Sequence, residues 1–215
     1  MSIRWELAGA ALAVAGDVLI LGRAVSGPDF DRAVGVLPPA LGEGDRWRSL
    51  WNGVTHSPGR TRLGSATGVL GIAVLSASGL ARAARQIDPG PLRSLTSAAV
   101  ATFAVSGAAT HVACGSIITA HQRSPACPGP TRLLAISAAG SLLSLATVSA
   151  ASTAAALSGQ RPAAGLWSVV GPFPPVLVAL LTFGHLPRPL GGYARPASIS
   201  LGLLAHFLAT GHCVP

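Results

Sequence analysis

Residues 133–157 read LLAISAAGSLLSLATVSAASTAAAL, without one charged side chain. As an α-helix this stretch would be about 37 Å long at 1.5 Å per residue, and about 20 apolar residues are enough to cross the hydrocarbon core of a bilayer. The sequence therefore predicts an all-α, polytopic transmembrane bundle of about six spans, with residues 1–215 forming one domain. The other five expected spans are residues 5–22, 63–80, 95–120, 166–184 and 197–214.

The composition explains why a lipid bilayer is the expected environment. Only 10% of the 215 residues are charged and 50% are hydrophobic, whereas an ordinary globular chain carries about 25% charged residues. Such a chain could not cover a water-exposed surface, but a surface that faces lipid needs no polar cover. The net charge of +8 does not indicate a nucleic-acid partner, because the arginines lie between apolar stretches and not in a cluster with aromatic residues.

Arginines set the expected orientation in the membrane. With six spans both termini lie on one side, called face A, and the opposite side is called face B. Ten of the 15 basic residues fall on face B, so the positive-inside rule places face B in the cytoplasm. We therefore expect a multi-pass protein of the inner cell membrane with extracytoplasmic termini. Asp17 within the first span and Glu6 beside Arg4 argue against a cleaved signal peptide.

One long loop is expected, at residues 23–62. Within it, residues 43–52 predict a short helix that carries Trp47 and Trp51 one turn apart. Such a helix is typical of the headgroup region of a bilayer. A loop of this length is either a lid over a site or a plain interfacial anchor, and the sequence leaves both interpretations open.

Small residues and prolines predict how the spans pack. Gly64 and Gly68 open the second span with a GxxxG step, which allows close approach of a neighbouring helix. Pro172, Pro174 and Pro175 interrupt the fifth span, so a kink is expected there. The sequence contains no convincing internal repeat, which argues against a transporter built from inverted halves.

Three ionisable residues lie at membrane depth and are the candidate catalytic residues: Asp17, His111 and His206. By helical rise Asp17 lies about 9 Å from face B and each histidine about 15 Å, so the three can converge in one layer. Ionisable groups at this depth are costly and usually functional, although Asp17 could simply bond a neighbouring helix and His111 a backbone carbonyl. Other polar residues gather toward face B and predict a pocket that opens there: Asp29, Asp31, His56, His121 and His185.

Several short motifs resemble an uncharacterised family of small six-span bacterial integral membrane proteins. They are the Gly16–Asp17 step, Arg62-Leu63-Gly64 at the start of the second span, His111 after a run of small residues, and Pro196-Ala197-Ser198 before the last span. The resemblance covers most of the chain and implies a six-span fold with a shared site at Asp17 and His111, but it implies no activity. Ile199 departs from the pattern, since such relatives carry Asn after the final Ser.

Three functions are compatible with these residues. The leading hypothesis is a membrane enzyme acting on a lipid-like substrate, in which Asp17 is the general acid of an isoprenoid cyclisation or isomerisation, His111 orients it or acts as the base, and no cofactor is required. The analogy is to small membrane-bound terpene cyclases. A second hypothesis is a zinc-dependent lipid hydrolase with Asp17, His111 and His206 as metal ligands. The third is a non-enzymatic lipid-binding, carrier or scaffold protein, and the oligomeric state is left open.

Overall fold

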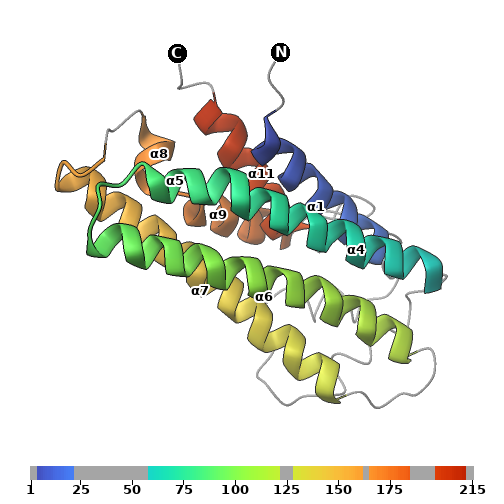
Figure 1. The fold of residues 1–215 in the computed structure, drawn as a ribbon. Helices are drawn as coiled ribbons and strands as arrows, with labels where there is room; N and C mark the ends of the chain where they lie inside the picture. The colour runs from blue at the N-terminus through green and yellow to red at the C-terminus, as the bar shows by residue number, and fades with distance from the viewer. Residues whose placement is uncertain (1–3, 22–57, 122–127, 162–164, 185–196, 212–215) are drawn as a thin grey trace.

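The computed structural model describes residues 4–21, 58–121, 128–161, 165–184 and 197–211, and these residues contain helices and turns but no strand. The prediction of an all-α fold is therefore confirmed for the described part of the chain (Figure 1). The elements in chain order are α1 (Trp5–Leu21), α4 (Pro58–Leu75), the π-helical turn η1 (Ser76–Leu80), α5 (Ala81–Arg85), α6 (Pro91–His121), α7 (Pro128–Leu157), α8 (Leu166–Val170), α9 (Phe173–Gly184) and α11 (Ser198–Gly211).

Three helical segments are long and apolar enough to cross a membrane: Gly59–Arg85, Pro91–Ser116 and Arg132–Leu157. They contain 26 or 27 residues, which gives about 39 Å of helix against about 30 Å of hydrocarbon core. α9 and α11 are apolar but contain only 12 and 14 residues. The described residues thus show three helices of membrane-spanning length, and the count of six remains a prediction.

Prolines determine where the long helices begin. α4, α6 and α7 begin at Pro58, Pro91 and Pro128, because the first helical position needs no N–H partner and suits the fixed φ of proline. α4 therefore starts five residues before the expected span at residues 63–80. Most of the expected loop at residues 23–62, with its interfacial helix at residues 43–52, lies outside the described residues.

α1 and α4 pack backbone to backbone. A Cβ atom placed on Gly16 of α1 would lie 2.5 Å from the Cα atom of Gly68 of α4, and one placed on Gly64 would lie 2.8 Å from the backbone nitrogen of Ile20. No side chain larger than hydrogen fits at these positions. The close approach predicted from the GxxxG step is confirmed, and the glycines hold α1 against α4 (Figure 1).

The proline-rich segment after α8 breaks the helix completely. Gly171 adopts φ +72°, a left-handed conformation that favours glycine, and α9 then begins at Phe173. The backbone N–H of Phe173 donates to Oγ of Ser149 on α7 at 2.8 Å, so a side chain replaces the missing helical partner. The interruption predicted from Pro172, Pro174 and Pro175 is confirmed.

The interior consists of medium-sized apolar side chains, and large apolar side chains also cover the outside. Leu75, Phe103 and Leu145 are at most 1% exposed in the core. In contrast, Val105 and Leu143 are 73% and 71% exposed on α6 and α7. An apolar exterior of this kind suits contact with lipid better than contact with water.

Candidate functional site

Asp17 and His111 lie in contact although they come from α1 and α6. The distance between Nε2 of His111 and Oδ1 of Asp17 is 3.1 Å, and the two side chains are 6% and 16% exposed. The structure thus brings together two of the three candidate residues in a nearly dry location. This contact is the centre of the candidate site.

Glycine at position 68 makes the contact possible. A Cβ atom on Gly68 would lie 2.6 Å from both Cγ and Nε2 of His111, so any side chain there would collide with the ring. Because Gly68 also packs against Gly16, the imidazole of α6 can cross the surface of α4 and reach Asp17, which follows Gly16 on α1. The glycine that permits helix packing therefore also provides the space for the histidine.

The hydrogen bond on the other side of the ring fixes one proton. Nδ1 of His111 lies 2.9 Å from the carbonyl oxygen of Gly107, and a carbonyl can only accept, so Nδ1 carries a hydrogen. A stable contact between Nε2 and Oδ1 of Asp17 then requires one more proton, held either as imidazolium with carboxylate or as neutral imidazole with carboxylic acid. The carboxyl of Asp17 and Nε2 of His111 therefore share one proton.

A serine that the sequence analysis did not identify completes the site. Oγ of Ser200 on α11 donates to Oδ2 of Asp17 at 2.7 Å, and Ser200 is 3% exposed. Nε2 of His111 makes no hydrogen bond of standard geometry among the described residues, so its short approach to Oδ1 is poorly aligned. Ser200 fixes one carboxyl oxygen, while the other is left for the proton and for His111. The signal in the sequence was two serines, Ser198 and Ser200, on either side of Ile199 at the start of an apolar span.

The backbone around His111 is also held by a neighbouring helix. Oγ of Ser65 on α4 donates to the backbone carbonyl of His111 at 3.2 Å. Cys114, one turn further along α6, is a free thiol. These small polar groups lie next to the pair on α4 and α6, and among the described residues no third His, Cys, Asp or Glu joins the pair in a group that could hold a metal ion.

His206, the third candidate, is not part of this group. It lies six residues after Ser200 on α11, about 9 Å further along the helix axis, beside the residue whose carbonyl oxygen accepts a bond from Arg4. In the described part of the chain, no three His, Cys, Asp or Glu side chains are placed to hold one metal ion. The expected convergence of Asp17, His111 and His206 is therefore not found, and these three residues do not fit a zinc ion together.

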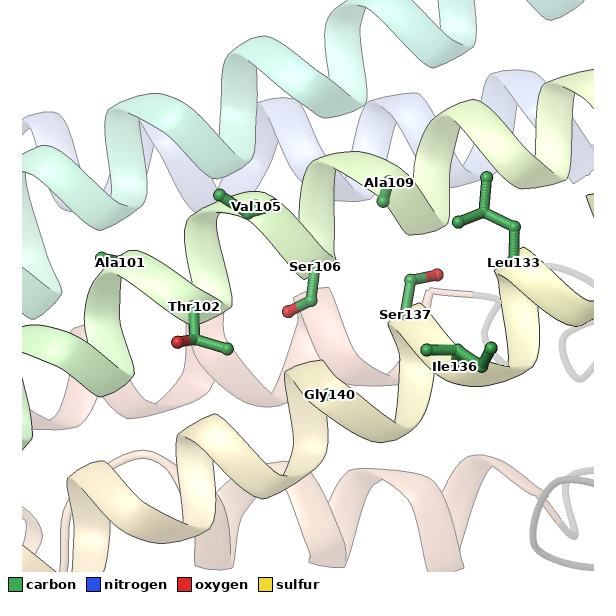
Figure 2. Close-up of a pocket in the computed structure, with 9 residues that line it drawn as sticks. All are labelled: Ala101, Thr102, Val105, Ser106, Ala109, Leu133, Ile136, Ser137 and Gly140. Atoms are coloured by element: carbon green, nitrogen blue, oxygen red, sulfur yellow. The ribbon is translucent and has the colours of Figure 1, made fainter.

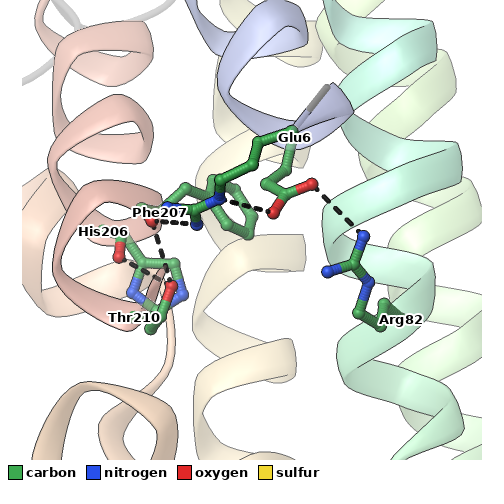
Figure 3. A network of polar contacts seen from close by, with 6 residues as sticks. Glu6, Arg82, His206, Phe207 and Thr210 are labelled. Atoms are coloured by element: carbon green, nitrogen blue, oxygen red, sulfur yellow. Dashed lines mark hydrogen bonds and ion pairs between the residues drawn. The ribbon is translucent and has the colours of Figure 1, made fainter. Parts of the chain in front are cut away.

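A second polar cluster lies at the face A end of the bundle, where α1 begins and α11 ends (Figure 3). Glu6 is 4% exposed and accepts from Nε of Arg4 and Nη2 of Arg82, both at 3.3 Å. Nη2 of Arg4 also donates to the carbonyl oxygen of Phe207 at 2.9 Å. These bonds join α1 to α5 and α11, so a structural role accounts for the whole Glu6 cluster.

An apolar groove of about 570 Å³ lies between α6 and α7 (Figure 2). Val105 and Ile136, two of its lining residues, are 73% and 64% exposed, so the groove is on the outer surface of the bundle. Two hydroxyl contacts join the helices beside it, Thr110 to Ser137 at 3.1 Å and Ser141 to Ser106 at 3.0 Å. Asp17 and His111 do not line it. The expected pocket toward face B depends on side chains outside the described residues and remains a prediction.

Fold and site together define a class: an α-helical chain with helices of membrane-spanning length and a buried carboxyl–imidazole pair. No protein-family model, curated protein or solved structure matches the chain. The resemblance to small six-span bacterial membrane proteins therefore remains a prediction.

Proposed function

We propose that this chain is a six-span inner-membrane enzyme that uses the Asp17–His111 pair to transfer a proton to a hydrophobic, lipid-like substrate, with its termini outside the cytoplasm. The single observation that carries the proposal is the 3.1 Å contact between Nε2 of His111 and Oδ1 of Asp17. On the other side of the ring, Nδ1 is hydrogen-bonded to the carbonyl oxygen of Gly107. Because the pair is buried within the helical bundle, bulk water does not compete with a substrate for the proton that the pair shares.

The chemistry best suited to this pair is acid-initiated isomerisation or cyclisation of an isoprenoid. The O–H bond of a protonated Asp17 breaks as a C–H bond forms on an olefinic carbon, and the positive charge moves to the neighbouring carbon. Loss of a proton from an adjacent carbon to the carboxylate, or to Nε2 of His111, then gives a new double bond. One proton enters and one leaves, so the reaction needs neither a cofactor nor a redox partner.

Each residue of the site has a separate task in this scheme. Asp17 is the group that reaches the substrate. Ser200 positions it through the 2.7 Å bond to Oδ2, which favours the ionised carboxyl after proton transfer. His111 can take up at Nε2 the proton that the substrate cation loses and return it to Asp17, since the bond from Nδ1 to Gly107 keeps Nε2 facing Oδ1.

The two alternatives are supported less well. A zinc-dependent hydrolase would need a third ligand near Asp17 and His111, and His206 does not supply one. A lipid-binding, carrier or scaffold protein would use the same pair as a buried structural contact. The tight glycine packing around His111 is the one observation that favours this third function.

Lipid analysis of cells that express the wild type, Asp17→Asn or Asp88→Asn tests the proposal. Asp17→Asn removes the acidic proton but keeps the shape and an acceptor for Ser200, while Asp88 is exposed and serves as a matched control. We expect one lipid product in wild-type and Asp88→Asn cells that is missing in Asp17→Asn cells. When purified protein converts the precursor in D2O, the product should carry one carbon-bound deuterium.

The opposite results point to the other functions. Identical lipid profiles for the wild type and a folded Asp17→Asn variant would leave binding or carrier activity and refute the enzyme. A product without carbon-bound deuterium, together with about one zinc ion per purified chain that Asp17→Asn loses, would favour the hydrolase.

A further inference from the structure

The groove between α6 and α7 runs inward from the start of α7. Its lining extends from Leu133 to Gly140 on α7 and from Ala101 to Ala109 on α6 (Figure 2). Each stretch rises about 10–12 Å along its helix, which is close to the roughly 15 Å depth of one leaflet of the hydrocarbon core. Leu133 comes directly after Arg132, where the membrane-spanning segment of α7 begins. The groove therefore has the position and the depth of a single lipid chain that enters from face B.

The hydroxyl groups in the lining of the groove already have partners. Thr102, Ser106 and Ser137 each donate to a carbonyl oxygen three or four residues earlier in the same helix, at 3.0, 3.4 and 3.1 Å. Ser106 and Ser137 also accept from a hydroxyl of the facing helix. No lining residue is charged. An occupant of the groove therefore needs to offer no hydrogen bond, and hydrocarbon suits this surface best.

The floor of the groove is too narrow for a helix. A Cβ atom on Gly140 would lie 3.3 Å from the Cβ atom of Ser106, so α6 and α7 are in contact below the groove. Val105 and Ile136 stand on its two sides and are 73% and 64% exposed. A helix with its side chains is about 10–12 Å wide and would rest on these two residues, whereas a hydrocarbon chain can lie between them. The shape thus favours a lipid chain over a helix of a second copy.

Arg132 supplies a positive charge at the outer end of the groove. It is exposed and lies one helical turn before Ile136, so both side chains are on the same face of α7. Side chains of a helix tilt toward its N-terminus, which directs the guanidinium away from the hydrocarbon and toward the headgroups. The ion pairs among the described residues involve Glu6 and Asp17, not Arg132. A phosphate in the headgroup region would complement this charge.

We propose that the groove between α6 and α7 binds one acyl chain of an anionic phospholipid whose phosphate lies at Arg132. Close packing in the groove holds the chain, because hydrocarbon gains little by leaving other lipid. The attraction between guanidinium and phosphate selects the anionic headgroup. Asp17 and His111 do not line the groove, so this site does not depend on the proposed proton transfer.

Photolabelling of the full chain in vesicles tests the acyl-chain site. The vesicles contain phosphatidylcholine and a small, non-saturating fraction of phosphatidylglycerol with a diazirine in one acyl chain, and mass spectrometry locates the labelled residues. A phosphatidylcholine probe with the same diazirine measures labelling by bulk lipid. We expect the phosphatidylglycerol probe to label the groove in the wild type. Ala109→Phe fills the groove and should lose these labels, whereas Ala154→Phe, at an exposed position of α7 outside the lining, should keep them.

The same assay tests the charge at Arg132. Arg132→Gln should lower labelling of the groove by phosphatidylglycerol about fivefold, since this is the contribution of one arginine near anionic headgroups. Arg62→Gln removes an exposed charge from α4 at the same membrane face and should change the labelling less than about twofold. Asp17→Asn should leave the labelling unchanged even where it abolishes the lipid product, so failure of the lipid site and failure of the proposed enzyme are distinguishable.

Three results would overturn the lipid site. The first is equal labelling of the groove in the wild type and in Ala109→Phe. The second is equal labelling by both probes with no effect of Arg132→Gln. The third is a groove without label in a cross-linked dimer that Ala109→Phe dissociates, which would make a second copy the occupant. If Ala109→Phe does not fold, Ala101→Phe, at an exposed position of the lining, decides in the same way.

Discussion

Replacing Gly68 by alanine should expel His111 from its place between α4 and α1. The new Cβ atom would lie 2.6 Å from Cγ and Nε2 of the ring, inside the 3.0 Å that real Cβ contacts essentially never cross. The ring is 5% exposed, so it cannot move without breaking the 2.9 Å bond to Gly107. Overpacking of a core costs about 1–3 kcal/mol, and a lost buried hydrogen bond about 1–3 kcal/mol. We therefore expect Gly68→Ala to lower the free energy of unfolding by about 2–6 kcal/mol.

Gly59→Ala on the same helix is the matched control. A Cβ atom on Gly59 meets nothing within 4 Å, and alanine in a helix is more stable than glycine by about 0.5–1 kcal/mol. The free energy of unfolding of this variant should therefore equal or exceed that of the wild type. Reversible unfolding in mixed micelles measures both variants, and the 15N resonances of the His111 ring report the contact to Asp17. If Gly68→Ala were as stable as Gly59→Ala and left those resonances unchanged, the absence of a side chain at position 68 would not be what makes room for the His111 ring.

Three further predictions concern other contacts. Ser200→Ala should lower the rate of the proposed proton transfer and cost about 1–2 kcal/mol of stability through loss of the bond to Asp17; unchanged kinetics and unfolding would remove Ser200 from the site. Gly171→Ala places a side chain at φ +72° with its Cβ atom 2.8 Å from the Cα atom of Ser149. It should destabilise the protein more than Gly159→Ala, because Gly159 has φ +73° but open space around it, so that variant should cost only about 1 kcal/mol. Equal losses of the two variants in denaturant unfolding would contradict this. Glu6→Gln should cost only about 1 kcal/mol in the same assay, because its partner Arg82 is 57% exposed and regains water, and a loss of several kcal/mol would show that the cluster is stronger than its geometry indicates.

Much of the fold could be predicted because apolar length and proline position act locally. The long helices α6 and α7 contain the spans expected at residues 95–120 and 133–157, and the break at Gly171 follows from backbone geometry near Pro172. The first turn of each long helix was not anticipated, because those residues are mainly proline, glycine, arginine, serine and threonine and the continuous apolar pattern begins only after them. The number of spans could not be settled in this way, since α9 and α11 are too short by themselves.

The site was harder to predict because depth along a helix does not specify depth in the bundle. Counting residues from each span's face B end placed Asp17, His111 and His206 in one layer, but those ends do not lie in one plane. α11 contacts Asp17 through Ser200, and His206 lies six residues further along, so it falls in a different layer. Asp17 and His111 meet because glycines let α1, α4 and α6 approach closely, a three-helix arrangement that no single stretch of sequence encodes.

Glu6 and the Asp17–His111 pair are buried polar groups that require different explanations. Glu6 joins α1 to α5 and, through Arg4, to α11, so its benefit to the fold is visible in its bonds. The direct contact between Asp17 and His111 gives no comparable benefit, because Nε2 lacks a bond of standard geometry, and a buried ion pair is often no more stable than apolar residues of the same volume. Replacing both residues by apolar ones, as in Asp17→Leu with His111→Phe, should therefore cost little more than the roughly 1–2 kcal/mol expected for loss of the Ser200 bond, if the new side chains fit beside Gly68. An apolar double variant that stays folded but loses the lipid product would show that the pair is present for its chemistry, whereas a double variant that unfolds would show that the pair holds the helices together.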